Sequence, residues 1–447
     1  MGVTVEVRNG KNTKESIANS ESPDDNKSNR LGNLATATHL FKGNVGAGIF
    51  AMGDCFKNGG LVGATVLLPI ICVICIHCDR LLIFASIDIV TKTPGVELYD
   101  YPDTVEKVFE YGPTSLRKFS KLMRTIVEMF LCVTQFGFCC IYFVFITENF
   151  HQVLQQNGIY IGETTTMTIL LLPAMLPSLL TNLKYISPVS MFAIVCMLFG
   201  LFATLLIAIV ALAQGEVPSL SERHLITNGP QMALFFGTAI FSYEGIALVL
   251  PLRNKMRNPE KFTSTFGVLN LTIMAVTTLL IFTGLVGYLR WGEDVKGSLT
   301  LNLDPNDIMS QIVKVLAAIG VFLGYPIQFF VLITIIWKPM KGGFDVTQNY
   351  PITMQVLLRF ILVLGTFAVA AIVPNLSLFI SLLGALCSTS LALLIPVLLD
   401  FTQRAGVPKG LTTWVYLKNI AIIGVTVVGI ATGTYQSIAE IIKVFFD

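Results

Sequence analysis

Residues 39–50, HLFKGNVGAGIF, place a histidine, a lysine, an asparagine and three glycines inside an apolar run. Glycine is among the weakest helix formers, yet a run of roughly 20 apolar residues crosses a bilayer as a helix. In hydrocarbon every backbone N–H and C=O must be paired, so a broken helix is stable only where protein or a water-filled cavity surrounds it. We therefore predict a break at Gly43, Asn44, Gly46 and Gly48, whose helix ends of opposite partial charge could hold a small zwitterion. Close helix packing through small residues is the alternative.

A second polar interruption lies in the sixth apolar run, which reads FFGTAIFSYEGIALVLP. Here Ser242, Tyr243, Glu244 and Gly245 break the run at mid-depth. A carboxylate at that depth is costly unless it is paired or protonated, so Glu244 could carry a proton, cap a helix end or receive an ammonium group. Tyr243 has the bulk to cover a pocket as a gate, although an aromatic residue at helical spacing is more often packing.

The whole chain has the composition of a membrane protein. Apolar residues make up 53% of its 447 residues and charged residues 13%, and its mean hydropathy of +0.71 is well above that of a soluble domain. The apolar runs are continuous, whereas a membrane barrel shows stretches of about ten residues with alternating polarity. We therefore predict an all-α integral membrane protein with about eleven spans. The expected spans are 34–56, 61–85, 123–145, 167–183, 189–213, 232–252, 266–289, 312–337, 356–373, 376–399 and 414–435.

The two interruptions occupy corresponding positions in this series. Spans one and six are the first helices of two five-span halves, and one extra helix remains at the end. Interrupted segments at matching positions of two halves are the best sequence indication of a transporter's binding site at the middle of the membrane. The pattern therefore favours discontinuous helices 1 and 6 beside a transport pathway.

Lysine and arginine gather in alternate connections, and this asymmetry predicts the orientation. A cytoplasmic N-terminus places most of these charges inside, including those at 117–121 and 253–261, and leaves few in the outer loops. Residues 1–32, rich in Ser, Asn, Asp, Glu and Lys, predict a disordered cytoplasmic tail. We expect the transmembrane domain at 33–436 and a short C-terminal tail at 437–447.

Four stretches carry a resemblance to a known family: HLFKGNVGAGIF, FSYEGIALVLP, YLRWGEDVKGSLTLNL at 288–303 and YPDTVEKVFEYGP at 101–113. Together they resemble the proton-coupled amino acid transporter family, a branch of the amino acid/auxin permeases, over residues 33–436. The resemblance implies an eleven-helix, LeuT-like 5+5 inverted-repeat fold that carries small neutral amino acids together with protons. It implies a plasma membrane or a lysosomal or endosomal membrane as the location. It also implies a role in proton coupling for the histidine that heads the first motif, which is His39 here.

The position of His39 fits that role. It lies four residues before Gly43, about one helical turn from the predicted break, and histidine is the side chain whose charge changes nearest neutral pH. A proton on His39 and a bound substrate carboxylate would each favour the other's binding, which is the basis of symport. The alternatives are a histidine that donates to a neighbouring carbonyl, and Glu244 as the proton carrier.

Other functions remain open at this stage. Sodium-coupled relatives of this architecture complete their ion site with hydroxyl groups in the middle of span eight, whereas residues 317–333 contain no Ser or Thr, so protons are favoured over sodium. An uncoupled carrier, or a membrane sensor that binds amino acids with little flux, would have a similar site. An enzyme is not expected, because the four histidines, at 39, 77, 151 and 224, are scattered and join no metal-binding or nucleophile motif. We expect no metal, no nucleic-acid partner and no cofactor beyond the coupling proton.

Two places in the chain depart from the family's pattern. Met52 and Gly53 stand where many relatives carry Leu-Pro, Asp54 follows them, and Arg253 stands where relatives tend to have Glu. These residues bear on the bend of span one, the width of the pocket and the inner exit.

Overall fold

The computed structural model describes residues 30–93, 99–179, 183–215, 223–343, 350–373, 375–405, 407, 410 and 412–446. Within these ranges the regular structure is helical, apart from a one-residue bridge between Leu31 and Met256. Most of the predicted N-terminal tail, residues 1–29, lies outside the described part of the chain. The residues predicted as a C-terminal tail continue the last helix as far as Phe446.

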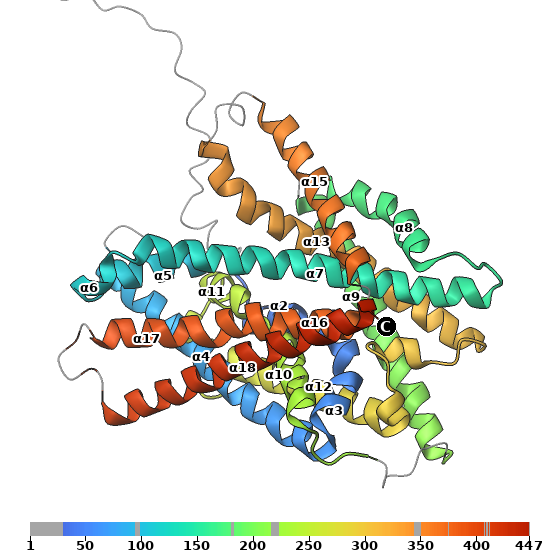
Figure 1. The fold of residues 1–447 in the computed structure, drawn as a ribbon. Coiled ribbons are helices and arrows are strands. Elements are labelled where there is room, and N and C mark those ends of the chain that lie inside the picture. The colour runs from blue at the N-terminus through green and yellow to red at the C-terminus, as the bar shows by residue number, and fades with distance from the viewer. Residues whose placement is uncertain are drawn as a thin grey trace, which may run out of the picture.

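The first half of the chain forms five spans (Figure 1). They are the broken pair α2 (Asn33–Asn44) and α3 (Met52–Gly59), then α4 (Leu61–Lys92), α7 (Ser120–Gln156), α8 (Glu163–Ser178) and α9 (Leu183–Ala213). Two short helices, α5 (Tyr101–Glu110) and α6 (Thr114–Arg117), connect α4 to α7. Asp100 begins α5, because its carboxylate accepts a 3.0 Å hydrogen bond from the Asp103 amide in a typical N-cap.

The second half begins with another broken pair, α10 (Gly229–Ser242) and α11 (Ile246–Asn254). It continues with α12 (Val268–Trp291), α13 (Ile308–Gly343) and α15 (Pro351–Ile372). The tenth span joins α16 (Leu376–Leu383) to α17 (Ile395–Ala405) through two π-helical stretches, η6 (Gly384–Ser388) and η7 (Ser390–Leu394). The extra helix is α18 (Thr413–Phe446).

These helices account for the predicted spans. In the described residues, nine segments are long and apolar enough to cross a membrane. The broken pair α2–α3 and the 16-residue α8 supply the other two. Several helices run further than predicted, as where α4 reaches Lys92 beyond the expected end at residue 85. Hydropathy detects the part of a helix that must be apolar, and the helix itself can continue into polar surroundings.

Whole helices flank the two broken ones. The half-helix α10 packs against α3, α16, η6 and α18, while α12 packs against α2, α3 and α4. On another side, α13 packs along both α7 and α9. Figure 1 shows α7 crossing the molecule, with α15 above it and α17 and α18 below it in this view. Protein therefore surrounds the interrupted backbone, as the bilayer interior requires.

Hydrogen bonds join the segment before the N-terminus of α2 to the segment after the C-terminus of α11. The Leu31 amide donates to the Lys255 carbonyl at 2.8 Å, and the Arg257 amide donates to the Leu31 carbonyl at 2.9 Å. These bonds hold the N-terminal end of α2 beside the C-terminal end of α11. We therefore expect the two half-helices to move together.

Beyond the break, α3 is held by close and polar contacts. The Asp54 carboxylate accepts a 2.9 Å hydrogen bond from Asn58 Nδ2, and it also accepts one from the Ser377 hydroxyl at the start of α16. A Cβ on Gly53 would lie 2.6 Å from the Leu299 side chain in η5 (Leu299–Asn302). The departures at Gly53 and Asp54 therefore lie where α3 packs against η5 and the start of α16.

Candidate substrate site

The first helix breaks where Val45 and Gly46 leave the helical conformation. Their φ and ψ angles are −93° and 90° for Val45 and −121° and −155° for Gly46, after which the chain resumes as the 3-10 helix η1 (Ala47–Ala51). The Asn44 side chain donates a 2.9 Å hydrogen bond to the Leu40 carbonyl. The next carbonyl, that of Phe41, accepts a 2.9 Å hydrogen bond from the Val45 amide, which ends the helical ladder.

The sixth span breaks at Tyr243, Glu244 and Gly245. The amides at this break are satisfied locally, since Glu244 N–H donates to Phe241 at 3.1 Å and Gly245 N–H donates to Tyr243 at 2.8 Å. The helix resumes at Ile246. Because these amides already have partners, the second break presents fewer free donors to a ligand than the sequence pattern implied.

The two breaks lie against each other. A Cβ on Gly245 would lie 2.5 Å from the Asn44 amide nitrogen, and a Cβ on Gly48 would lie 3.1 Å from the Phe241 ring. A Cβ on Gly43 would lie 2.2 Å from the Leu248 side chain. Glycine at these three positions lets the two broken helices approach, so both predicted roles of the glycines, interruption and close packing, occur together.

A cavity of about 260 Å³ opens beside the first break. Its walls come from α2, α7, α9, α11 and α13, and it lies on the His39 side of the break. The lining is mostly apolar and includes Met197 and Leu248. This volume is slightly below the roughly 300–1,000 Å³ that is usual for ligand pockets, so the space suits a small solute.

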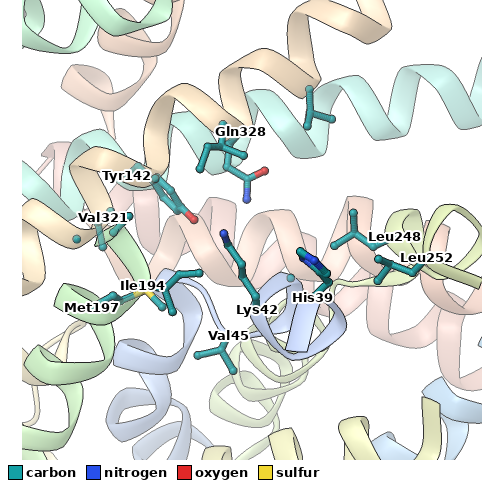
Figure 2. Close-up of a pocket in the computed structure, with 16 residues that line it drawn as sticks. His39, Lys42, Val45, Tyr142, Ile194, Met197, Leu248, Leu252, Val321 and Gln328 are labelled. Carbon is teal, nitrogen blue, oxygen red and sulfur yellow. The ribbon is translucent and has the colours of Figure 1, made fainter. Parts of the chain in front are cut away.

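Three polar side chains converge in this cavity. Figure 2 shows the amine of Lys42 pointing between the hydroxyl of Tyr142 and the side-chain amide of Gln328. The Tyr142 hydroxyl and the Gln328 side chain both face this cavity. An ammonium, a hydroxyl and an amide within one small apolar space can together bind a carboxylate, because each supplies a donor and one carries positive charge.

The predicted site residues divide into two groups around this cavity. His39 and Gly43 line it directly, and a Cβ on Gly46 would lie 3.7 Å from the Tyr142 hydroxyl that faces it. Asn44 is buried against the second break. The remaining positions in or near the contact between the breaks are Gly48, Ser242 and Gly245.

Tyr243 and Glu244 are outside the cavity lining. The Tyr243 hydroxyl donates to the Leu68 carbonyl at 3.2 Å and to Thr277 Oγ1 at 3.0 Å, so this side chain packs between α4 and α12. Glu244 is only 8% exposed, and Oε2 of its carboxyl group has no hydrogen-bond partner. The hydroxyl group of Ser388 in η6 approaches that carboxyl group. The second break therefore directs its two largest side chains away from the cavity.

Several cavity residues lie in helices that contain none of the quoted motifs. Tyr142 lies in α7, Met197 in α9 and Gln328 in α13, each as an isolated residue within an apolar run. One available signal was the pair Gly320 and Gly324 in α13, one turn apart. Both line the cavity, and a Cβ on Gly324 would lie 3.3 Å from the Tyr142 ring, so this small-residue face marks the cavity wall.

The helices have the arrangement of the LeuT-like fold, in which each five-helix half begins with a broken helix. The chain is similar to the inward-facing structure of Mhp1, a nucleobase-cation-symport-1 family transporter. The TM-score is 0.50 at 13% sequence identity, and the match covers 93% of this chain and 91% of that one. This likeness concerns the fold and confirms the predicted architecture.

The chain belongs to the transmembrane amino acid transporter family, whose model matches residues 29–439. It is 31% identical over 413 residues to the proton-coupled amino acid transporter-like protein pathetic of Drosophila melanogaster, covering 92% of this chain and 85% of that protein. It is 26% identical over 432 residues to the amino acid transporter AVT3C of Arabidopsis thaliana, covering 92% and 91%. These matches confirm the predicted family and a transporter rather than an enzyme.

Proposed function

We propose that this protein carries small neutral amino acids across a membrane together with protons. Amino acid transport follows from the family, and the convergence of Lys42, Tyr142 and Gln328 in the cavity supports the finer statement. In this proposal, the three side chains hold the substrate's carboxylate, and the apolar wall around Met197 and Leu248 receives its side chain.

The charge and size of the cavity support a small neutral substrate. Among the described residues, the charged or titratable side chains of the lining are His39, Lys42 and Tyr142, and no acidic group accompanies them. A basic substrate would bury its side-chain charge without a partner, which is costly. The volume of about 260 Å³ favours the smaller amino acids over those with large aromatic side chains.

Two observations support a proton as the coupling ion. His39 lies in the cavity wall near Leu248 and Leu252, on the same face of α2 as Lys42 (Figure 2). A substrate carboxylate bound nearby and a proton on His39 would stabilise each other. The Drosophila relative is also named as proton-coupled.

The same proposal includes an orientation and a location. The distribution of lysine and arginine supports a cytoplasmic N-terminus, which places the cavity on the cytoplasmic side of the break. The family resemblance supports a plasma, lysosomal or endosomal membrane. Epitope tags at the N-terminus and in an outer loop, probed in intact and permeabilised cells, test this arrangement.

Uptake into proteoliposomes tests the transport proposal. A panel of radiolabelled amino acids is measured at about pH 5.5 and about pH 7.5 on the source side, a range over which histidine titrates, with potassium replacing sodium. We expect accumulation of small neutral amino acids that grows as the pH falls and that is largely lost in His39→Ala. Accumulation that requires sodium, or that ignores the proton gradient, would contradict proton coupling. Binding without accumulation would indicate a sensor.

A further inference from the structure

A second cavity lies beside the N-terminal end of α2 and the C-terminal end of α11, separate from the substrate cavity. Its volume is about 400 Å³, which is within the usual range for ligand pockets. Its polar and charged lining comes from three helices and the segment before α2, and comprises Arg30, Ser86, Thr91, Arg253 and Asn254. Among the described residues, none lines both cavities.

Backbone hydrogen bonds bring two arginines to this cavity. The Leu31 amide donates to the Lys255 carbonyl at 2.8 Å, and the two segments form a parallel bridge at Leu31 and Met256. Arg30 directly precedes Leu31, and Arg253 lies two residues before Lys255. The pairing of the two backbone segments therefore sets both arginines at one cavity.

The protein does not balance the charge of this cavity. Its described lining contains two arginines and no acidic side chain. The acids nearest to the lining in sequence are Asp88, which pairs with Lys92, and Glu260 in η3 (Pro259–Lys261). Glu260 acts on Arg253 through its charge, but it is exposed and does not line the cavity. Two like charges at one enclosed space repel each other, and an anion between them removes that cost.

Two buried polar atoms at the cavity also lack partners. The Nε of Arg253 donates no hydrogen bond to a described residue, and Oδ1 of Asn254 accepts none. The Nδ2 of Asn254 is occupied, because it donates to the Tyr99 carbonyl at 3.4 Å. A buried donor or acceptor without a partner is destabilising. A ligand with acceptor oxygens for the arginine and a hydroxyl donor for the asparagine would satisfy both atoms.

A phosphate group has this chemistry. It carries a charge of about −1.5 to −2 at neutral pH, so one phosphate offsets both arginines, whereas one carboxylate offsets a single arginine. Guanidinium groups bind phosphate through paired N–H donors. A phosphate that keeps one proton also supplies the hydroxyl donor that Asn254 needs, and the buried hydroxyl of Ser86 lies on the opposite wall in α4.

We propose that this cavity binds a phosphate group, supplied by a soluble anion or by a phosphorylated lipid headgroup, and that the bound phosphate holds α2 and α11 against α4. The effect on transport rests on the proposed function. A phosphate that bridges Arg30 and Arg253 to Ser86 joins the ends of two half-helices to a whole helix. Because α2 and α11 are expected to move together, this bridge restrains both.

Binding can be measured without transport. The full-length protein is placed in phosphatidylcholine nanodiscs, and its unfolding temperature is measured with inorganic phosphate, with chloride at matched ionic strength, and with phosphatidylinositol bisphosphate added to the lipid. A ligand that binds only the folded protein raises this temperature. Arg30→Gln and Arg253→Gln should each weaken the apparent affinity for the stabilising probe by about tenfold or more. Arg257→Gln, the matched control, should bind like wild type, because Arg257 is exposed and outside the cavity lining.

The two probes distinguish the source of the phosphate. Stabilisation by inorganic phosphate supports a soluble anion, and stabilisation by the phosphorylated lipid alone supports a headgroup. Stabilisation by neither probe would overturn the proposal. Equal weakening in Arg257→Gln would also overturn it, because the attraction would then be a general property of a basic surface.

Arg253→Glu separates loss of binding from loss of folding. Its carboxylate can pair with Arg30, so the variant should lose phosphate binding while keeping the unfolding temperature that wild type has without phosphate. Phosphate binding that survives in this variant would contradict the site.

Amino acid exchange in proteoliposomes tests the restraint on α2 and α11. The stabilising probe should lower the exchange rate of wild type several-fold, and this inhibition should be lost in Arg253→Gln. Exchange by that variant without the probe shows that it is folded. An equal wild-type rate with and without a saturating probe would overturn the restraint. If the wild-type protein carries no amino acid, the proposed function fails while the binding result still stands.

Discussion

Asn44 at the end of α2 lies against Gly245 in the α10–α11 break so closely that a Cβ on Gly245 would be 2.5 Å from the Asn44 amide nitrogen. Asn44 also donates to the Leu40 carbonyl within its own helix. The Asn44 side chain therefore bonds to its own helix at the first break and contacts the second break. In a transporter that alternates between two states, this contact requires the two breaks to change together.

Replacing Gly245 with alanine tests this contact. The added methyl group must displace Asn44, and overpacking of this kind costs about 1–3 kcal/mol. We expect Gly245→Ala to lower the thermal stability of the purified protein and to reduce amino acid uptake by about tenfold. The control is Gly424→Ala on α18, where an added Cβ meets nothing within 4 Å. Equal behaviour of the two variants would show that the contact is loose.

The proposed contact between Lys42 and the substrate's carboxylate can be tested with a single substitution. A hydrogen bond to a charged group contributes about 1.5–3 kcal/mol, so Lys42→Met should weaken the apparent substrate affinity by about 10- to 150-fold. Isothermal titration calorimetry or competition binding with the favoured amino acid measures this change. Lys92→Met is the matched control, because Lys92 is exposed and pairs with Asp88. Unchanged affinity in Lys42→Met would show that the Lys42 ammonium does not bind the substrate.

Replacing Tyr243 tests whether its hydroxyl group stabilises the fold or binds the substrate. Its hydroxyl bonds to the Leu68 carbonyl and Thr277, so Tyr243→Phe should cost about 1 kcal/mol of stability while leaving substrate affinity within about twofold. A thermal unfolding assay combined with binding measurements separates the two effects. Tyr435→Phe serves as the control, since Tyr435 is 73% exposed on α18. A large loss of affinity at unchanged stability would place the Tyr243 hydroxyl at the substrate.

The eleven spans and the two breaks could be predicted because the bilayer imposes simple rules on a sequence. A span must be apolar for roughly 20 residues, and a glycine or charge within it stands out. The direction of the side chains at a break could not be predicted in the same way. Tyr243 and Glu244 lie where the helical repeat is lost, so sequence spacing no longer indicates which residues share a face. They point toward α4, α12 and η6 rather than toward the cavity.

The cavity itself was only partly predictable for a different reason. Gly43 and His39 belong to a motif, whereas Tyr142 and Gln328 come from α7 and α13, far apart in the chain. A single tyrosine or glutamine in an apolar run is compatible with packing against a neighbouring helix, and only the tertiary arrangement shows that the two meet.

The contact between Asp54 and Ser377 allows a test of how α3 is held against α16. Asp54 lies in α3 and accepts hydrogen bonds from Asn58 and from Ser377 at the start of α16. Because the Ser377 hydroxyl joins two separate spans, Ser377→Ala should leave each helix intact but weaken their association, and α3 amides should exchange deuterium several-fold faster in lipid nanodiscs. The variant Ser264→Ala, at an exposed loop position, should exchange like wild type. Faster exchange over the whole protein would indicate general destabilisation instead. Unchanged exchange in α3 would mean that apolar packing, such as that of Gly53 against Leu299, suffices to hold α3 in place.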